Sequence, residues 1–133
     1  MRHIKFISAA IVLFTIVFFT MGAKSSSPHK PGPVAITIVG FPDGTVTATG
    51  ALETTGTNYM VVRSSGKSHA GAIHCTNYVV TPQGTFTILM DCQFTTSTGQ
   101  WCITNGTGAY ANIKGNGSLL MPPDQEAMTG YIY

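Results

Sequence analysis

Hydrophobic and polar residues alternate with a period of two along most of the chain after residue 33. Residues 45–49 read Thr-Val-Thr-Ala-Thr, which places apolar side chains on one face of a strand and hydroxyls on the other. Short segments of this kind, separated by Gly- and Pro-rich turns, predict eight strands, at residues 34–39, 45–49, 59–63, 72–81, 85–94, 100–104, 117–121 and 129–133. We therefore expect an all-β fold, an eight-stranded antiparallel barrel, with a β-sandwich as the alternative.

The first 23 residues have the layout of a secretory signal peptide. Arg2 and Lys5 give a short positive region, residues 6–21 are uncharged and largely apolar, and small residues precede the expected cut after Ala23. The apolar run is shorter than the roughly 20 residues that span a bilayer. We expect a secreted or periplasmic protein without a membrane span in its mature form; an uncleaved N-terminal membrane anchor is the alternative. The Ser- and Pro-rich residues 24–33 predict a linker, which leaves residues 34–133 for the barrel domain.

Composition and charge narrow the possible partners. Charged residues make up only 9% of the chain and hydrophobic residues 44%. Once Arg2 and Lys5 are removed with the signal peptide, the basic and acidic residues are equal in number. A neutral surface exerts no long-range attraction on a phosphate backbone, so we expect no nucleic-acid partner.

A Gly-rich segment at residues 105–117 is the most distinctive motif of the chain. Its Tyr110 and Ile113 are three residues apart, so both can lie on one side of a helical turn that closes a barrel end. Glycine permits backbone angles closed to other residues, and no Lys-Ser/Thr follows to make a phosphate-binding loop. We assign structural roles to Gly106, Gly108, Gly115 and Gly117. A plain hairpin that turns at Asn116-Gly117 is the alternative.

The same segment fits the pattern G-T-G-x-aromatic-x-x-aliphatic-x-G-x-G, and it resembles the signature of the allene oxide cyclase and dirigent-like β-barrels, a calycin-like fold. The closer likeness is to small exported bacterial proteins of this type without assigned activity. They carry an aromatic residue before the motif, as Trp101 does here, and end on a strand like residues 129–133. Residues 44–52 are similar to their first hairpin, although Thr55 stands where an Asp is common.

The resemblance implies a non-catalytic binding or structural module that can hold a small apolar ligand. The alternative it offers is a cyclase- or dirigent-like enzyme, an isomerase that steers a reactive apolar intermediate inside the barrel by shape and exclusion of water. The catalytic polar residues of the family do not map onto positions of this chain.

Few side chains suggest chemistry of their own. His69 and His74 would face opposite sides of one strand, so we expect neither a metal nor a cofactor. No G-x-S-x-G elbow is present, and we assign no catalytic residue. Asn77 falls on the strand face that holds Cys75 and Val79, and a buried Asn needs a hydrogen-bond partner, which a ligand can supply. Our candidate ligand-binding residues are Asn77, Met90, Trp101 and Tyr110; the alternative role of each is in the core or at a barrel end.

The three cysteines predict one disulfide. A two-residue turn at Gln83-Gly84 would pair Cys75 directly with Cys92, with apolar faces in agreement, and would leave Cys102 as the odd thiol. Directly opposite Cβ atoms come close to the reach of a disulfide. The rival pairing, Cys92 with Cys102, would turn Trp101 and Ile103 outward. We therefore expect a Cys75–Cys92 disulfide.

Overall fold

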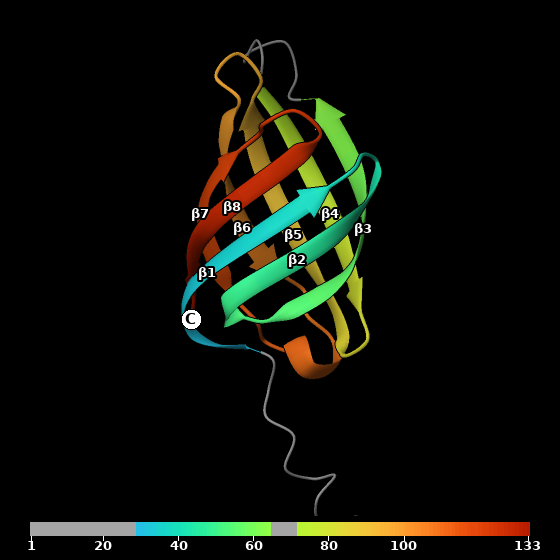
Figure 1. Cartoon of the computed structure of the whole chain (residues 1–133), viewed down its shortest axis with the longest axis vertical. Helices are drawn as coiled ribbons and strands as arrows, with labels where there is room; N and C mark the ends of the chain where they lie inside the picture. Colours follow the sequence, from blue (N-terminus) through green and yellow to red (C-terminus); the bar gives the residue numbers. More distant parts are fainter. Residues whose placement is uncertain (1–28, 65–71) are drawn as a thin grey trace, which may run out of the picture.

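The computed structural model describes residues 29–64 and 72–133, and in this part of the chain eight antiparallel strands close into one barrel (Figure 1). The elements are β1 (His29–Val39), β2 (Asp43–Leu52), β3 (Thr54–Ser64), β4 (Ala72–Thr81), β5 (Gly84–Gln93), β6 (Thr98–Thr104), the 3-10 helix η1 (Gly108–Tyr110), β7 (Gly115–Leu120) and β8 (Gln125–Ile132). Each strand pairs with the next, and β1 pairs with β8 from Gly32–Ile132 to Val39–Gln125. This closure excludes the β-sandwich, and all eight predicted strands are confirmed.

The first strand begins earlier than predicted. His29 already pairs with Leu52 of β2, and Pro33 pairs with Tyr131 of β8, so residues 29–33 belong to the sheet and not to a linker. The register with β2 shifts between His29 and Val34. Proline lacks the N–H that a regular ladder needs, and strands tolerate proline where the register shifts in this way. The predicted signal peptide and the rest of the linker lie outside the described residues.

The β4–β5 register differs from the prediction by two residues. Thr81 pairs with Gly84, so the turn residues are Pro82 and Gln83, and Cys75 lies opposite Met90 while Cys92 lies opposite Ile73. Proline suits the first central position of such a turn. The Thr81 hydroxyl accepts a hydrogen bond from the Gln83 N–H (3.1 Å) and donates to the Gly84 carbonyl (3.1 Å), which closes the turn at this place.

The predicted Cys75–Cys92 disulfide is not formed. All three cysteines are free thiols. The prediction assumed that Cys75 and Cys92 lie directly opposite each other, and this pairing is wrong. Diagonal neighbours across an antiparallel pair are farther apart than opposed ones. A slip of two residues leaves the side-chain faces unchanged, so both cysteines still face the interior and are buried, as the pattern predicted.

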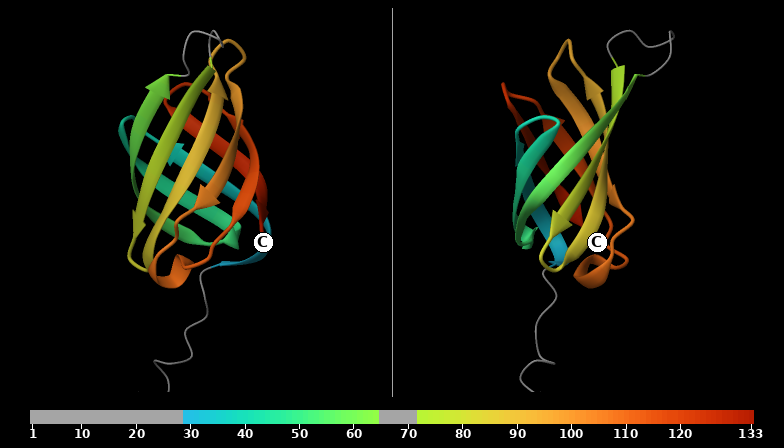
Figure 2. Two further views of the ribbon diagram at one scale, coloured as in Figure 1. Left: turned by 180° about the vertical axis from the view of Figure 1, so that it is seen from behind. Right: turned by 90° about the vertical axis from the view of Figure 1, so that its right-hand side faces the viewer.

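The lower end of the barrel in Figure 1 is closed by η1, as the spacing of Tyr110 and Ile113 predicted (Figures 1 and 2). Both side chains are buried. The Tyr110 ring packs edge-on against Phe86, with ring centroids 5.0 Å apart. Its hydroxyl donates to Thr54 (2.8 Å), and its oxygen lies 3.2 Å from the Thr81 hydroxyl oxygen, so the plug contacts β3 and β4. The alternative hairpin at Asn116-Gly117 is not formed, because both residues lie within β7.

The glycines of this segment stand where chains approach closely. A Cβ at Gly106 would lie 1.7 Å from the Tyr110 carbonyl oxygen, and one at Gly117 would lie 2.0 Å from that of Thr129. Gly108 has φ +60°, which L-residues rarely adopt. At Gly115 a Cβ would meet the Ile132 side chain and the Tyr131 carbonyl. These contacts explain glycine at the four positions.

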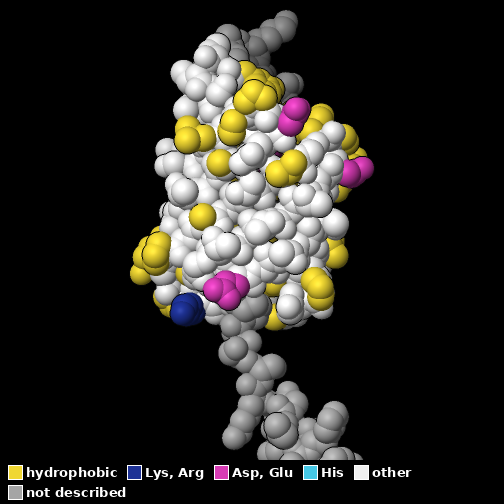
Figure 3. Space-filling view, in the orientation of Figure 1, with side chains coloured by type: hydrophobic (Ala, Val, Ile, Leu, Met, Phe, Trp, Pro, Cys, Tyr) yellow, Lys and Arg dark blue, Asp and Glu magenta, His cyan; other side chains and the backbone are white. Residues whose placement is uncertain are grey.

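The outer surface carries little charge. On the face shown in Figure 3, neutral side chains and backbone dominate, and hydrophobic and acidic side chains form small separate groups. Among the described residues, no helix is long and apolar enough to cross a membrane.

Candidate functional site

Three polar side chains face the interior in the upper half of the barrel. Asn77 of β4 is fully buried, Asn58 of β3 is 4% exposed, and Glu126 of β8 is partly buried. Asn58 Nδ2 donates to Asn77 Oδ1 (2.7 Å), and Asn77 Nδ2 is 3.5 Å from Glu126 Oε2. Asn58 Oδ1 is buried and has no hydrogen-bond partner. Because buried polar groups without partners cost free energy, this group of side chains, the interior polar cluster, needs an explanation.

Sulfur atoms surround the interior polar cluster. The second Asn77 contact is with the Met90 thioether, 3.4 Å from Asn77 Nδ2. Cys75 lies opposite Met90, and its thiol hydrogen-bonds with that of Cys92. This bond lowers the pKa of Cys75, whose thiolate it stabilises, and raises the pKa of Cys92, which burial raises further. Cys92 is therefore a neutral thiol at physiological pH.

Glu126 is the one interior carboxyl among the described residues, and its environment changes its titration. Burial raises its pKa from 4.5 to about 7, and the hydrogen bond from Asn77 opposes part of that rise. Near neutral pH the carboxyl is therefore present in both forms. A group of this kind can accept or donate a proton, or bind a cation when ionised.

The four predicted ligand-binding residues do not form one site. Asn77 and Met90 are in contact, and Trp101 pairs with Met90 in the β5–β6 ladder. The Trp101 side chain is buried, and its Nε1 donates to the backbone carbonyls of Ser118 in β7 (3.1 Å) and Thr129 in β8 (3.2 Å). Tyr110 lies at the other end of the barrel, in the plug. Of the four, only Asn77 belongs to the interior polar cluster, and Met90 is in contact with it.

Sequence reasoning missed Glu126 and Asn58. Glu126 has a signal that alternation could have revealed, because it is in phase with the inward-facing Met128 and Ile132 of the same strand. The predicted strand began at residue 129, three residues after Glu126, and so excluded it. Asn58 was missed in the same way, since the predicted strand began at residue 59 and β3 begins at Thr54.

The middle of the barrel is filled by side chains. Inward residues such as Phe86, Ile88, Leu52 and Ile132 are at most 1% exposed. The two largest grooves, of about 600 and 620 Å³, are instead lined mainly by outward-facing side chains of β5–β7 and of β1–β4. None of the grooves described here is lined by Asn77, Met90 or Glu126, and Asn77 and Met90 are at most 2% exposed. A ligand in the upper half of the interior therefore requires side chains to rearrange, as flexible methionines can.

An ion pair between neighbouring strands lies on the outer face. His74 Nδ1 contacts Asp91 Oδ1 across the β4–β5 ladder, and both side chains are exposed. Asp91 therefore faces solvent. We expect Asp91→Asn to change the free energy of unfolding by less than about 0.5 kcal/mol, because solvent screens exposed pairs. Chemical denaturation measures this; a loss above 1.5 kcal/mol would assign the pair a structural role that exposure does not suggest.

The three thiols differ in accessibility. Cys102 is partly exposed, whereas Cys75 and Cys92 are buried. We expect iodoacetamide to modify Cys102 of the folded protein at least ~10-fold faster than the other two, because the reagent must reach a thiolate. Peptide mapping by mass spectrometry checks the order, with unfolded protein as the control. Equal labelling of Cys75 and Cys102 in folded protein would contradict the burial of Cys75.

Neither a metal site nor a known relative gives a further indication of function. Among the described residues, no three His, Cys, Asp or Glu side chains gather as a metal site would require. No protein-family model, no curated protein and no solved structure matches the chain. What is established is therefore the fold, a small closed barrel of eight antiparallel strands.

Proposed function

We propose that this protein is exported and serves as a non-catalytic binding module that holds one small, mainly apolar ligand in the upper half of its barrel. The N-terminal signal pattern and the resemblance of residues 105–117 to the allene oxide cyclase and dirigent-like barrels support this proposal. Eight strands enclose an interior wide enough for side chains or one small ligand.

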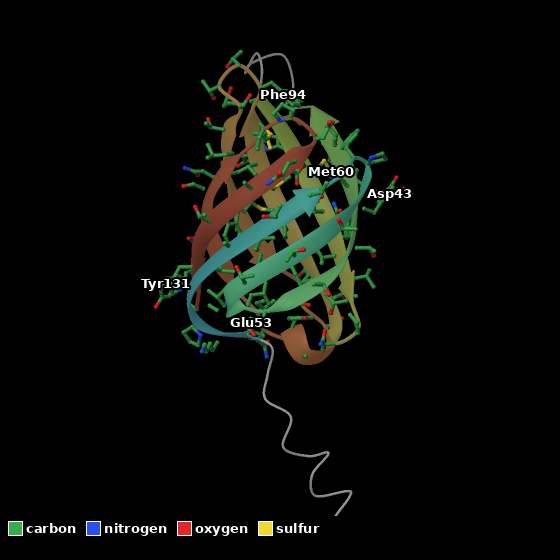
Figure 4. All side chains as sticks on the ribbon, in the orientation of Figure 1. Asp43, Glu53, Met60, Phe94 and Tyr131 are labelled. Atoms are coloured by element: carbon green, nitrogen blue, oxygen red, sulfur yellow. The ribbon has the colours of Figure 1, made fainter. Side chains whose placement is uncertain are left out.

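The observation that carries the proposal is the interior polar cluster. A barrel that serves only as a scaffold gains nothing from a partly buried carboxyl and a buried, unpartnered amide oxygen. Ligand sites, in contrast, combine an apolar wall with a few placed polar groups. Met60 and Met90 line the same region, and Figure 4 labels Met60 in the upper half of the barrel.

Native mass spectrometry of the protein purified from its own host tests the proposal. We expect a noncovalent adduct that is released on denaturation. Tyr110→Phe, which alters only the plug at the lower end, should retain the adduct. Protein that carries no adduct and does not increase the fluorescence of the apolar dye Nile red would contradict ligand binding and leave a purely structural module.

A cyclase- or dirigent-like enzyme is the second candidate, and Glu126 is the observation that favours it. A carboxyl with a pKa of about 7 inside an apolar barrel is suited to move a proton near neutral pH. If the adduct is chemically converted by the wild-type protein, and Glu126→Gln binds it without converting it, the protein belongs to this second class.

A further inference from the structure

Glu126 is placed in the barrel wall without a positive partner. It pairs with Ile38 in the β1–β8 ladder and is in phase with inward-facing residues of β8. Its one described polar contact is the long one with Asn77 Nδ2. The titratable groups near it are the thiols of Cys75 and Cys92, on which its charge acts unfavourably. No neighbour described here compensates the negative charge.

The cations of the described residues lie elsewhere. Lys30, Arg63 and Lys114 are exposed, and none forms an ion pair with Glu126. His74 is on the outer face with Asp91. A partly buried carboxylate that lacks a cation is unfavourable unless something else supplies one.

The interior polar cluster also has more acceptors than donors. Both N–H groups of the Asn77 amide are used, on Met90 and on Glu126, and one of the two N–H groups of Asn58 donates to Asn77. Two kinds of hydrogen-bond acceptor remain without a donor. One is Asn58 Oδ1, which is buried and has no partner, and the other is the remaining lone pairs of the Glu126 carboxylate. A ligand that complements this end of the barrel must therefore donate hydrogen bonds.

We propose that the ligand is a small apolar amine, whose ammonium group pairs with the Glu126 carboxylate while its hydrocarbon part contacts the methionines and Ile73. This inference rests on the proposed function and specifies its ligand class. An ammonium supplies both the missing positive charge and several N–H donors. Met60 and Met90 offer unbranched side chains that adapt to a hydrocarbon chain.

Three ligands that share one hydrocarbon chain separate charge from hydrophobicity: octylamine, octanol and octanoate, each below its micelle concentration. Isothermal titration at pH 8 should give octylamine an affinity ~10-fold above octanol, with octanoate the weakest. In Glu126→Gln the preference for octylamine over octanol should disappear. Glu53→Gln is the matched control, because Glu53 is an exposed carboxylate at the lower end of the barrel (Figure 4).

The pH dependence of the wild-type protein gives a second, variant-free measurement. Octylamine remains cationic from pH 5.5 to 8, whereas Glu126 is protonated at the lower pH. The affinity of the protein for octylamine should therefore fall about 10-fold between pH 8 and 5.5, whereas its affinity for octanol should not change. Circular dichroism confirms that each variant is folded.

The outcomes distinguish this inference from the proposed function. Equal affinities for octylamine and octanol, or an unchanged preference in Glu126→Gln, would overturn the amine assignment and keep the apolar-ligand site. Binding of none of the three by a folded protein would overturn both.

Discussion

Tyr110→Ala should lower the free energy of unfolding by about 3–5 kcal/mol, the largest loss we expect from a single substitution in this barrel. The ring is fully buried, packs against Phe86 and closes the lower end of the barrel. Its removal leaves a cavity that neighbouring strands cannot fill, because closure fixes their spacing. It also leaves the Thr54 and Thr81 hydroxyls without their shared partner. Chemical denaturation monitored by circular dichroism gives the value.

Tyr110→Phe separates the two contributions. It keeps the ring and removes only the hydroxyl, so we expect a loss of about 1–2 kcal/mol. A loss of less than 1 kcal/mol in Tyr110→Ala would mean that η1 is not a structural plug and that the barrel is held at this end by its ladders alone.

The stability of the protein should fall as the pH rises from about 4.5 to about 7. In this range the folded state keeps the Glu126 proton, because its pKa is raised to about 7, whereas the unfolded state has already lost it at 4.5. The unfolded state therefore binds fewer protons, and stability decreases with pH through this window and then levels off. Since the carboxyl lies near solvent at the upper end, we expect a decrease on the order of 2 kcal/mol.

Glu126→Gln should remove this pH dependence and be more stable than wild type at pH 8. Denaturation curves at pH 4.5, 6 and 8 for wild type, Glu126→Gln and the exposed Glu53→Gln provide the comparison. A wild-type stability that is flat across these values, or a slope retained in Glu126→Gln, would show that the carboxyl is solvated in the folded protein.

Local pattern determined the secondary structure and the class of fold. Alternation in segments such as β2 and β5 reflects the two faces of a strand, and each strand's own residues carry that information. The plug could be anticipated for the same reason, because the spacing of Tyr110 and Ile113 and the surrounding glycines are local features. Neither required knowledge of which strands meet.

Register was determined by contacts that no single segment contains. Gly84 suggested a turn glycine, but a Cβ there would lie 2.2 Å from the Thr107 carbonyl oxygen, so its role is to let the segment before η1 approach. The turn itself is set by Pro82 and the Thr81 hydroxyl. This difference moved the partner of Cys75 from Cys92 to Met90 and removed the basis of the disulfide.

The interior polar cluster forms only because the barrel closes. Asn77 could be placed inside from its own strand, because alternation reports which face a residue occupies. That it contacts Asn58 and reaches Glu126, 49 positions away in the chain, depends on how β3, β4 and β8 curve around one interior. The sequence by itself therefore determined the strands, the neutral surface and the inward face of Asn77. Only the tertiary structure decided which polar groups share the barrel, because their meeting depends on strand tilt and closure, to which all eight strands contribute.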